Sequence, residues 1–134
     1  MTGGPGTIWG VGLGPGDPDL MSVRADRLVR SGTHIAYFRK KGRPGRARKI
    51  VEELLRPDAT EIAMEYPVTT EIAFDDPAYS ACLSDFYADV SAQLRDLALA
   101  GHDIVVLCEG DPFFYGSFMH LYTRLKDAVP VNVV

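Results

Sequence analysis

VVLCEGDPFFYGSFM, residues 105–119, has the pattern of a buried strand, a sharp turn and the start of a helix in immediate succession. Ile104–Cys108 is a short apolar run rich in β-branched residues, as in a parallel strand that is covered on both faces. Gly110 and Pro112 interrupt this run. Ligands of open α/β sheets bind just beyond the carboxyl ends of the strands, so this turn is the first place to expect a binding site.

Strand and helix signals alternate along the whole chain. Strands are expected at residues 7–13, 34–38, 60–64, 102–108 and 131–134, and helices at about 20–30, 46–55, 77–97 and 114–126. The third helix has the clearest signals, with Asp76 as its N-cap, Pro77 at its first position and Gly101 beyond its end. Asp17 and Ser22 are competing N-caps for the first helix. The alternation predicts an α/β fold, a three-layer sandwich with a mostly parallel five-stranded sheet.

The composition is that of an ordinary globular domain. With 134 residues, of which 46% are hydrophobic and 24% charged, the chain can bury a core of its own. No apolar run reaches the roughly 20 residues that span a bilayer, residues 1–10 lack a signal peptide, and the net charge of −4 disfavours nucleic acid as a partner. Cys82 and Cys108 lack CxxC spacing, and His34, His102 and His120 lack metal-ligand spacing. We therefore expect a cytoplasmic protein without a metal site, a membrane segment or a nucleic-acid partner.

A second glycine-rich turn, VGLGPGDP at residues 11–18, follows the first expected strand. A dinucleotide-binding fingerprint is one interpretation, but the spacing is GxGxG rather than GxGxxG. Pro15 also lacks the N–H that a phosphate needs, and Asp17 places a carboxylate against an anion. The tripeptide GDP occurs in both turns, at residues 16–18 and 110–112, each time after an apolar strand.

These two turns resemble the motifs of the tetrapyrrole methylase family, also called the corrin/porphyrin methyltransferases. The first family motif, VGxGPGDPxLxT, is matched by VGLGPGDPDLMS, with Ser22 in place of Thr, and the second, GDPxxYG, is matched by GDPFFYG at residues 110–116. YPVTTE at residues 66–71 and CEGDPFFYGSFMHL at residues 108–121 most resemble the members that methylate C-20 of precorrin-2 in cobalamin biosynthesis. The cobalt-factor II C-20 methyltransferases of the anaerobic route are the alternative within the family.

The resemblance implies a two-domain protein of which residues 1–134 form the N-terminal domain, the C-terminal domain being absent from this chain. Members of the family bind S-adenosylmethionine in the cleft between the domains and usually work as homodimers. The residues that the resemblance assigns to the methyl donor are Pro15, Glu109, Gly110, Asp111, Phe114, Tyr115 and Gly116. Asp17 falls near the tetrapyrrole and is the candidate carboxylate for removing a substrate proton. Phe38 occupies the position at which some relatives carry an acidic proton acceptor.

A basic segment follows the second expected strand. Half of the 14 Lys and Arg residues lie in it, namely Arg39, Lys40, Lys41, Arg43, Arg46, Arg48 and Lys49. We expect the loop cations to steer and hold the carboxylates of a tetrapyrrole, and assign substrate binding to Arg39, Lys40, Lys41 and Arg43. A solvated loop without a ligand is the plainer interpretation. RNA binding is less favoured, because no aromatic residue is interleaved in the run.

Three functions follow from these patterns. The first is part of an S-adenosylmethionine-dependent methyltransferase that acts on precorrin-2, in which alignment of donor and acceptor supplies roughly 7–11 kcal/mol of the barrier lowering. The second is a nucleotide-binding oxidoreductase domain, which requires NAD(P) at residues 12–16. The third is a non-catalytic interaction module, in which the last strand, residues 131–134, pairs with another chain.

Overall fold

The computed structural model describes residues 4–67, 76–110, 112 and 117–134. The sheet has five strands in the order β3-β2-β4-β1-β5, and all four pairings between neighbouring strands are parallel. The strands are β1 Ile8–Gly12, β2 His34–Lys40, β3 Thr60–Tyr66, β4 Ile104–Cys108 and β5 Val131–Val133. The helices are η1 Pro18–Leu20 (a 3-10 turn), α1 Val23–Ser31, α2 Arg46–Val51, α3 Pro77–Leu99 and α4 Ser117–Leu125.

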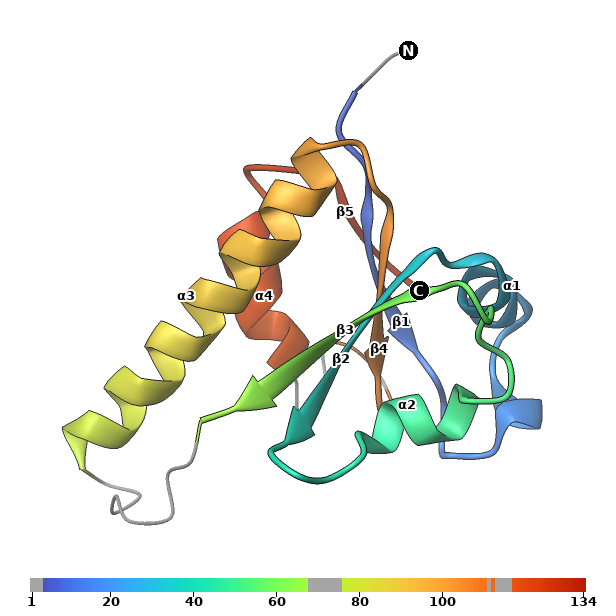
Figure 1. Ribbon diagram of the computed structural model, residues 1–134, viewed down its shortest axis with the longest axis horizontal. Coiled ribbons are helices and arrows are strands. Elements are labelled where there is room, and N and C mark those ends of the chain that lie inside the picture. The colour runs from blue at the N-terminus through green and yellow to red at the C-terminus, as the bar shows by residue number, and fades with distance from the viewer. Residues whose placement is uncertain (1–3, 68–75, 111, 113–116) are drawn as a thin grey trace.

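The helices cover both faces of the sheet, which confirms the predicted three-layer α/β sandwich. Figure 1 shows α3 and α4 together on one side of the strands and α1 and α2 on the other. Each face has its own hydrophobic cluster. Leu94 of α3, Phe118 of α4 and Val106 of β4 belong to the cluster on one face, and Val29 of α1 and Val51 of α2 belong to the cluster on the other.

Both candidate N-caps near the start of the chain are used, each by a different element. The Asp17 carboxylate accepts a hydrogen bond from the Asp19 backbone N–H at 2.9 Å and caps η1. The Ser22 hydroxyl accepts one from the Ala25 N–H at 3.1 Å and caps α1. The expected single helix from about residue 20 is therefore a 3-10 turn followed by an α-helix.

The second and third strands are longer than predicted. β2 continues through Lys40 and β3 through Tyr66, because Arg39 pairs in register with Glu65 and Lys40 with Tyr66. The Arg39 guanidinium also donates to the Glu65 carboxylate at 2.9 Å. The assignment of Arg39 and Lys40 to a loop is therefore wrong: they lie in a parallel strand pair, and the turn begins only after them.

The third helix begins as predicted. Asp76 accepts a hydrogen bond from the Ala78 N–H at 2.8 Å, Pro77 is the first helical residue, and Gly101 adopts a φ of +98° beyond the end of the helix. α2 is shorter than expected and ends at Val51. Within the described ranges, no helix combines the length and apolar character needed to cross a membrane.

Candidate functional site

The two glycine-rich turns meet at the carboxyl edge of the sheet, because β1 and β4 are neighbours and run in the same direction. The Gly110 N–H donates to the Gly14 carbonyl at 3.3 Å, and the Leu13 N–H donates to the Cys108 carbonyl at 3.0 Å. Gly14 and Gly110 have φ values of +74° and +64°, which favour glycine. A Cβ atom on Gly12 would lie 2.4 Å from the Gly110 carbonyl oxygen. The junction therefore depends on glycine in both turns.

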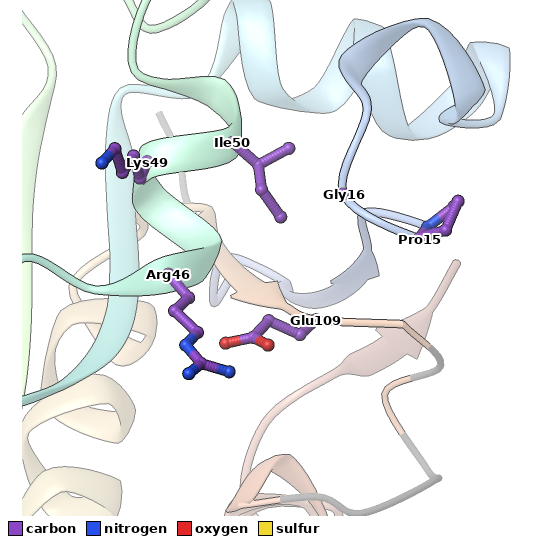
Figure 2. A pocket seen from close by; sticks show the side chains of 7 residues that line it. Pro15, Gly16, Arg46, Lys49, Ile50 and Glu109 are labelled. Atoms are coloured by element: carbon purple, nitrogen blue, oxygen red, sulfur yellow. The ribbon is translucent and has the colours of Figure 1, made fainter.

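A cleft of about 390 Å³ opens beside this junction. Its walls are formed by Gly14, Pro15, Gly16, Arg46, Lys49, Ile50 and Glu109. Figure 2 shows α2 on one side of the cleft and the first turn on the other, with the Arg46 and Glu109 side chains pointing toward one another. A second hollow of about 340 Å³ also touches Gly14, and its lining comprises Gly12, Gly14, Leu20, Ser22, Gly110, Pro112, Val133 and Val134.

The residues predicted to contact the methyl donor fall into two groups. Pro15 and Glu109 are exposed and line the cleft, and Gly110 lines the second hollow, so the structure brings three of them together from two distant parts of the chain. The other four lie outside the described residues: Asp111, Phe114, Tyr115 and Gly116. Their assignment stays a prediction.

Asp17, the predicted catalytic carboxylate, is exposed and is absent from the lining of both hollows. One of its oxygens is already engaged in capping η1. Its part in proton transfer stays a prediction. Among the described residues, Glu109 contributes a carboxylate to the lining of the cleft.

The basic segment is divided by its ion pairs. Arg48 donates to Glu61, which lowers the pKa of that carboxyl, and Arg39 is paired with Glu65. The other predicted substrate-binding residues, Lys40, Lys41 and Arg43, are exposed and line neither of the two hollows. The cations that do line the cleft are Arg46 and Lys49, which were not among the four assigned to substrate. Their separation by three positions in a helical segment was the available signal, since such residues share a face.

A hydrogen-bonded group of three hydroxyls lies on the α3 and α4 side of the same sheet edge. The Ser117 hydroxyl is hydrogen-bonded to the Tyr66 hydroxyl and, at 3.0 Å, to that of Tyr87. Burial raises the pKa of Tyr66 to about 12. Phe38 stacks on Tyr66 with ring centroids 5.5 Å apart. The position at which some relatives carry an acid is therefore part of an aromatic cluster here.

The three histidines have structural surroundings. The His34 and His102 rings lie 4.4 Å apart where β2 begins and just before β4, at the opposite edge of the sheet from the cleft. Burial, followed by the charge of His102, lowers the pKa of His34. His120 stacks on Tyr87 at 4.3 Å. Among the residues whose placement is given, no three His, Cys, Asp or Glu side chains are grouped as metal ligands.

The sequence profile described as Tetrapyrrole (Corrin/Porphyrin) Methylases matches residues 7–134. The chain belongs to the tetrapyrrole methylase family. The predicted resemblance is thereby confirmed. The structure also disfavours a dinucleotide-binding fingerprint in this tetrapyrrole methylase chain, because η1 separates the first glycine-rich turn from the N-terminus of α1.

Relatives within the family extend well beyond the length of this chain. It is 50% identical over 132 residues to the precorrin-2 C(20)-methyltransferase of Sinorhizobium sp, covering 98% of this chain and 54% of that protein. It is 46% identical over 120 residues to the cobalamin biosynthesis protein CobIJ of Mycobacterium tuberculosis, covering 90% of this chain and 24% of that protein. The chain thus spans about half the length of the first relative.

Solved structures of tetrapyrrole methylases have the same fold. Cobalt precorrin-4 methyltransferase CbiF superposes with a TM-score of 0.65 at 21% identity, over 96% of this chain and 44% of the other. Uroporphyrin-III-C-methyltransferase from Thermus thermophilus gives a TM-score of 0.64 at 22% identity, over 96% and 46%. These likenesses support the fold, and this chain corresponds to about half of each.

Proposed function

We propose that this chain provides the donor-binding domain of an S-adenosylmethionine-dependent methyltransferase that acts on C-20 of precorrin-2 in cobalamin biosynthesis. The observation that carries the proposal is the contact between the two GDP-containing turns at Gly14 and Gly110, directly beside an open cleft. The 50% identity to a precorrin-2 C(20)-methyltransferase supports the substrate. A uroporphyrin-III C-methyltransferase of the same fold is known as a complex with S-adenosyl homocysteine, which supports the donor.

The residues at this edge fit such a donor. Positions 12, 14 and 110 are glycine, so a ligand in the hollows could approach the main chain there closely. An added Cβ at Gly12 would collide with the Gly110 carbonyl oxygen. The Glu109 carboxylate offers a negative charge to a sulfonium. S-adenosylmethionine supplies an electrophilic methyl group when bound. The chain's own contribution is to orient the donor relative to the substrate. Methyl transfer between two aligned reactants needs no covalent intermediate with the protein.

Loss of a proton from the methylated substrate requires an acceptor. Asp17 is the proposed acceptor, with water as the alternative. One oxygen of the Asp17 carboxylate caps η1, and the other oxygen would accept the proton. Assembly as a homodimer with a further domain and a cytoplasmic location are part of the same proposal. They rest on the family to which the chain belongs.

The test of the donor site is a calorimetric titration of this chain with S-adenosylhomocysteine, with NADP as the control ligand. We expect a micromolar Kd, which corresponds to about −8 kcal/mol, and no heat with NADP. Heat with NADP and none with S-adenosylhomocysteine would overturn the proposal in favour of an oxidoreductase domain. Incubation with S-adenosylmethionine and either precorrin-2 or cobalt-factor II, followed by mass spectrometry, then tells which tetrapyrrole gains a methyl group.

A further inference from the structure

One wall of the cleft is formed by a single face of α2. Arg46, Lys49 and Ile50 lie three and four positions apart, so their side chains share that face. Ala47 and Val51, on the opposite face, are 6% and 0% exposed and belong to the hydrophobic core. This burial fixes the rotation of the helix about its axis. Arg46 and Lys49, here called the cleft cations, both line the cleft from this helix; in Figure 2 the Arg46 side chain points toward Glu109, and the Lys49 side chain lies on the side of α2 away from Glu109.

Unlike Arg39 and Arg48 of the same segment, the cleft cations have no ion-pair partner among the described residues. Arg39 is neutralised by Glu65 at 2.9 Å, and Arg48 is bound to Glu61 through two nitrogens. Within the described part of the chain, neither cleft cation forms an ion pair. Arg48 and Arg39 thus join α2 and β2 to β3, whereas Arg46 and Lys49 line the open cleft without such an ion pair.

We propose that the cleft cations form a subsite for one carboxylate of the substrate, with Ile50 supplying an apolar surface for the macrocycle beside it. A guanidinium can bind a carboxylate through two parallel hydrogen bonds, and an ammonium adds a point charge from the neighbouring turn of the helix. This inference deepens the proposed function and rests on it. It moves substrate recognition from the end of β2 and the exposed turn after it to the wall of the cleft.

Glu109 determines where in the cleft that carboxylate binds. It lies across the cleft and points toward Arg46, and it carries the same charge as the ligand (Figure 2). A substrate carboxylate is therefore favoured on the Lys49 side of Arg46, away from Glu109. Removing the charge of Glu109 should strengthen the binding of a polycarboxylate, whereas removing either cleft cation should weaken it.

The experiment is a fluorescence titration of this chain with uroporphyrin III, a macrocycle with carboxylate side chains around its rim. Arg46→Gln and Lys49→Gln should each raise the Kd about fivefold to tenfold, because each variant loses a charged contact that its exposure to solvent weakens. Glu109→Gln should lower the Kd. The matched controls are Arg27→Gln on α1 and Lys126→Gln after α4, which change the charge equally at exposed positions outside the cleft. Circular dichroism melts confirm that every variant is folded.

The outcomes separate the subsite from the proposed function. If the cleft variants bind uroporphyrin III as well as the controls do, or if Glu109→Gln weakens binding as much as Arg46→Gln, the subsite is wrong and the donor site is unaffected. If the unmodified chain binds S-adenosylhomocysteine but not uroporphyrin III, the subsite is also overturned. If it binds neither, the proposed function fails and the subsite with it.

Discussion

At the residue scale, the junction of the two turns depends on glycine, which has no side chain. Gly12 approaches the second turn so closely that a methyl group there would meet the Gly110 carbonyl oxygen at 2.4 Å and the Pro112 Cδ at 3.0 Å. Gly110 itself has open space around it but a φ of +64°, so its need for glycine is conformational. A β-branched substitution at Gly110 would combine a loss of binding with backbone strain. Gly12 is therefore the cleaner position at which to test the junction.

Gly12→Ala should weaken both folding and donor binding. Because the added methyl group meets backbone, the turns must separate, and we expect a loss of about 1–3 kcal/mol in the free energy of unfolding, as for overpacking elsewhere. The heat of S-adenosylhomocysteine binding should fall with it. The control is Gly42→Ala, where φ is +78° and no atom is within reach, so only a strain of roughly 1–2 kcal/mol is expected. Urea unfolding and calorimetry measure the two effects, and donor affinity that is unchanged in Gly12→Ala but reduced in Gly42→Ala would remove the junction from the site.

At the element scale, the sequence predicts those features whose causes are local. The start of α3 is encoded in the adjacent residues Asp76 and Pro77, and both proved correct. The ends of β2 and β3 were missed because they depend on pairing between residues 26 positions apart, such as Arg39 and Glu65, which no local pattern reveals. The motifs predicted where a site would form. The orientation of α2, which is set by burial of its apolar face, determines which cations line the cleft. The succession of basic residues alone does not reveal that orientation.

The Ser117 hydroxyl joins three elements at the cleft edge of the sheet, since it bonds Tyr66 at the end of β3 and Tyr87 of α3 from the first turn of α4. Ser117→Ala should cost about 1–3 kcal/mol, because two phenols lose a shared partner, whereas Tyr66→Phe removes one bond and should cost about 0.5–1.5 kcal/mol. The midpoints of urea unfolding, compared at the same dependence of the free energy of unfolding on urea concentration, measure the costs of the two variants. Equal costs for the two variants would contradict a shared role.

The same group of hydroxyls gives a pH dependence with a defined sign. The pKa of Tyr66 is raised from 10.0 to about 12 in the folded chain, so the folded state favours the neutral phenol. Its contribution to stability is complete below pH 10 and is lost as the pH rises from 10 toward 12. Tyr66→Phe should remove this part of the alkaline loss, measured as the difference between its unfolding midpoints and those of the unmodified chain across that range.

At the scale of the whole molecule, we expect the chain to fold on its own. Both faces of the sheet are covered by helices, and each has a hydrophobic cluster with fully buried members such as Leu94 on one side and Val29 on the other. Trp9, the one tryptophan of the sequence, is half-buried in β1 between the two edges of the sheet, and Arg24 lies over its ring at 5.2 Å. Its fluorescence therefore reports on the packing of β1 within the sheet.

We expect the chain to unfold in urea in one cooperative transition, with a slope of about 1–3 kcal/mol per molar urea and coincident midpoints by Trp9 fluorescence and far-ultraviolet circular dichroism.

Because the proposed donor site is made by two segments that come together only on folding, S-adenosylhomocysteine should bind the folded state alone. At a concentration 100 times its Kd it should then raise the free energy of unfolding by about 2.7 kcal/mol. NADP at the same concentration is the control. Separate transitions by the two probes would mean that the core depends on a further part of the protein, and a midpoint that S-adenosylhomocysteine leaves unchanged would contradict a donor site formed by this half of the methylase fold.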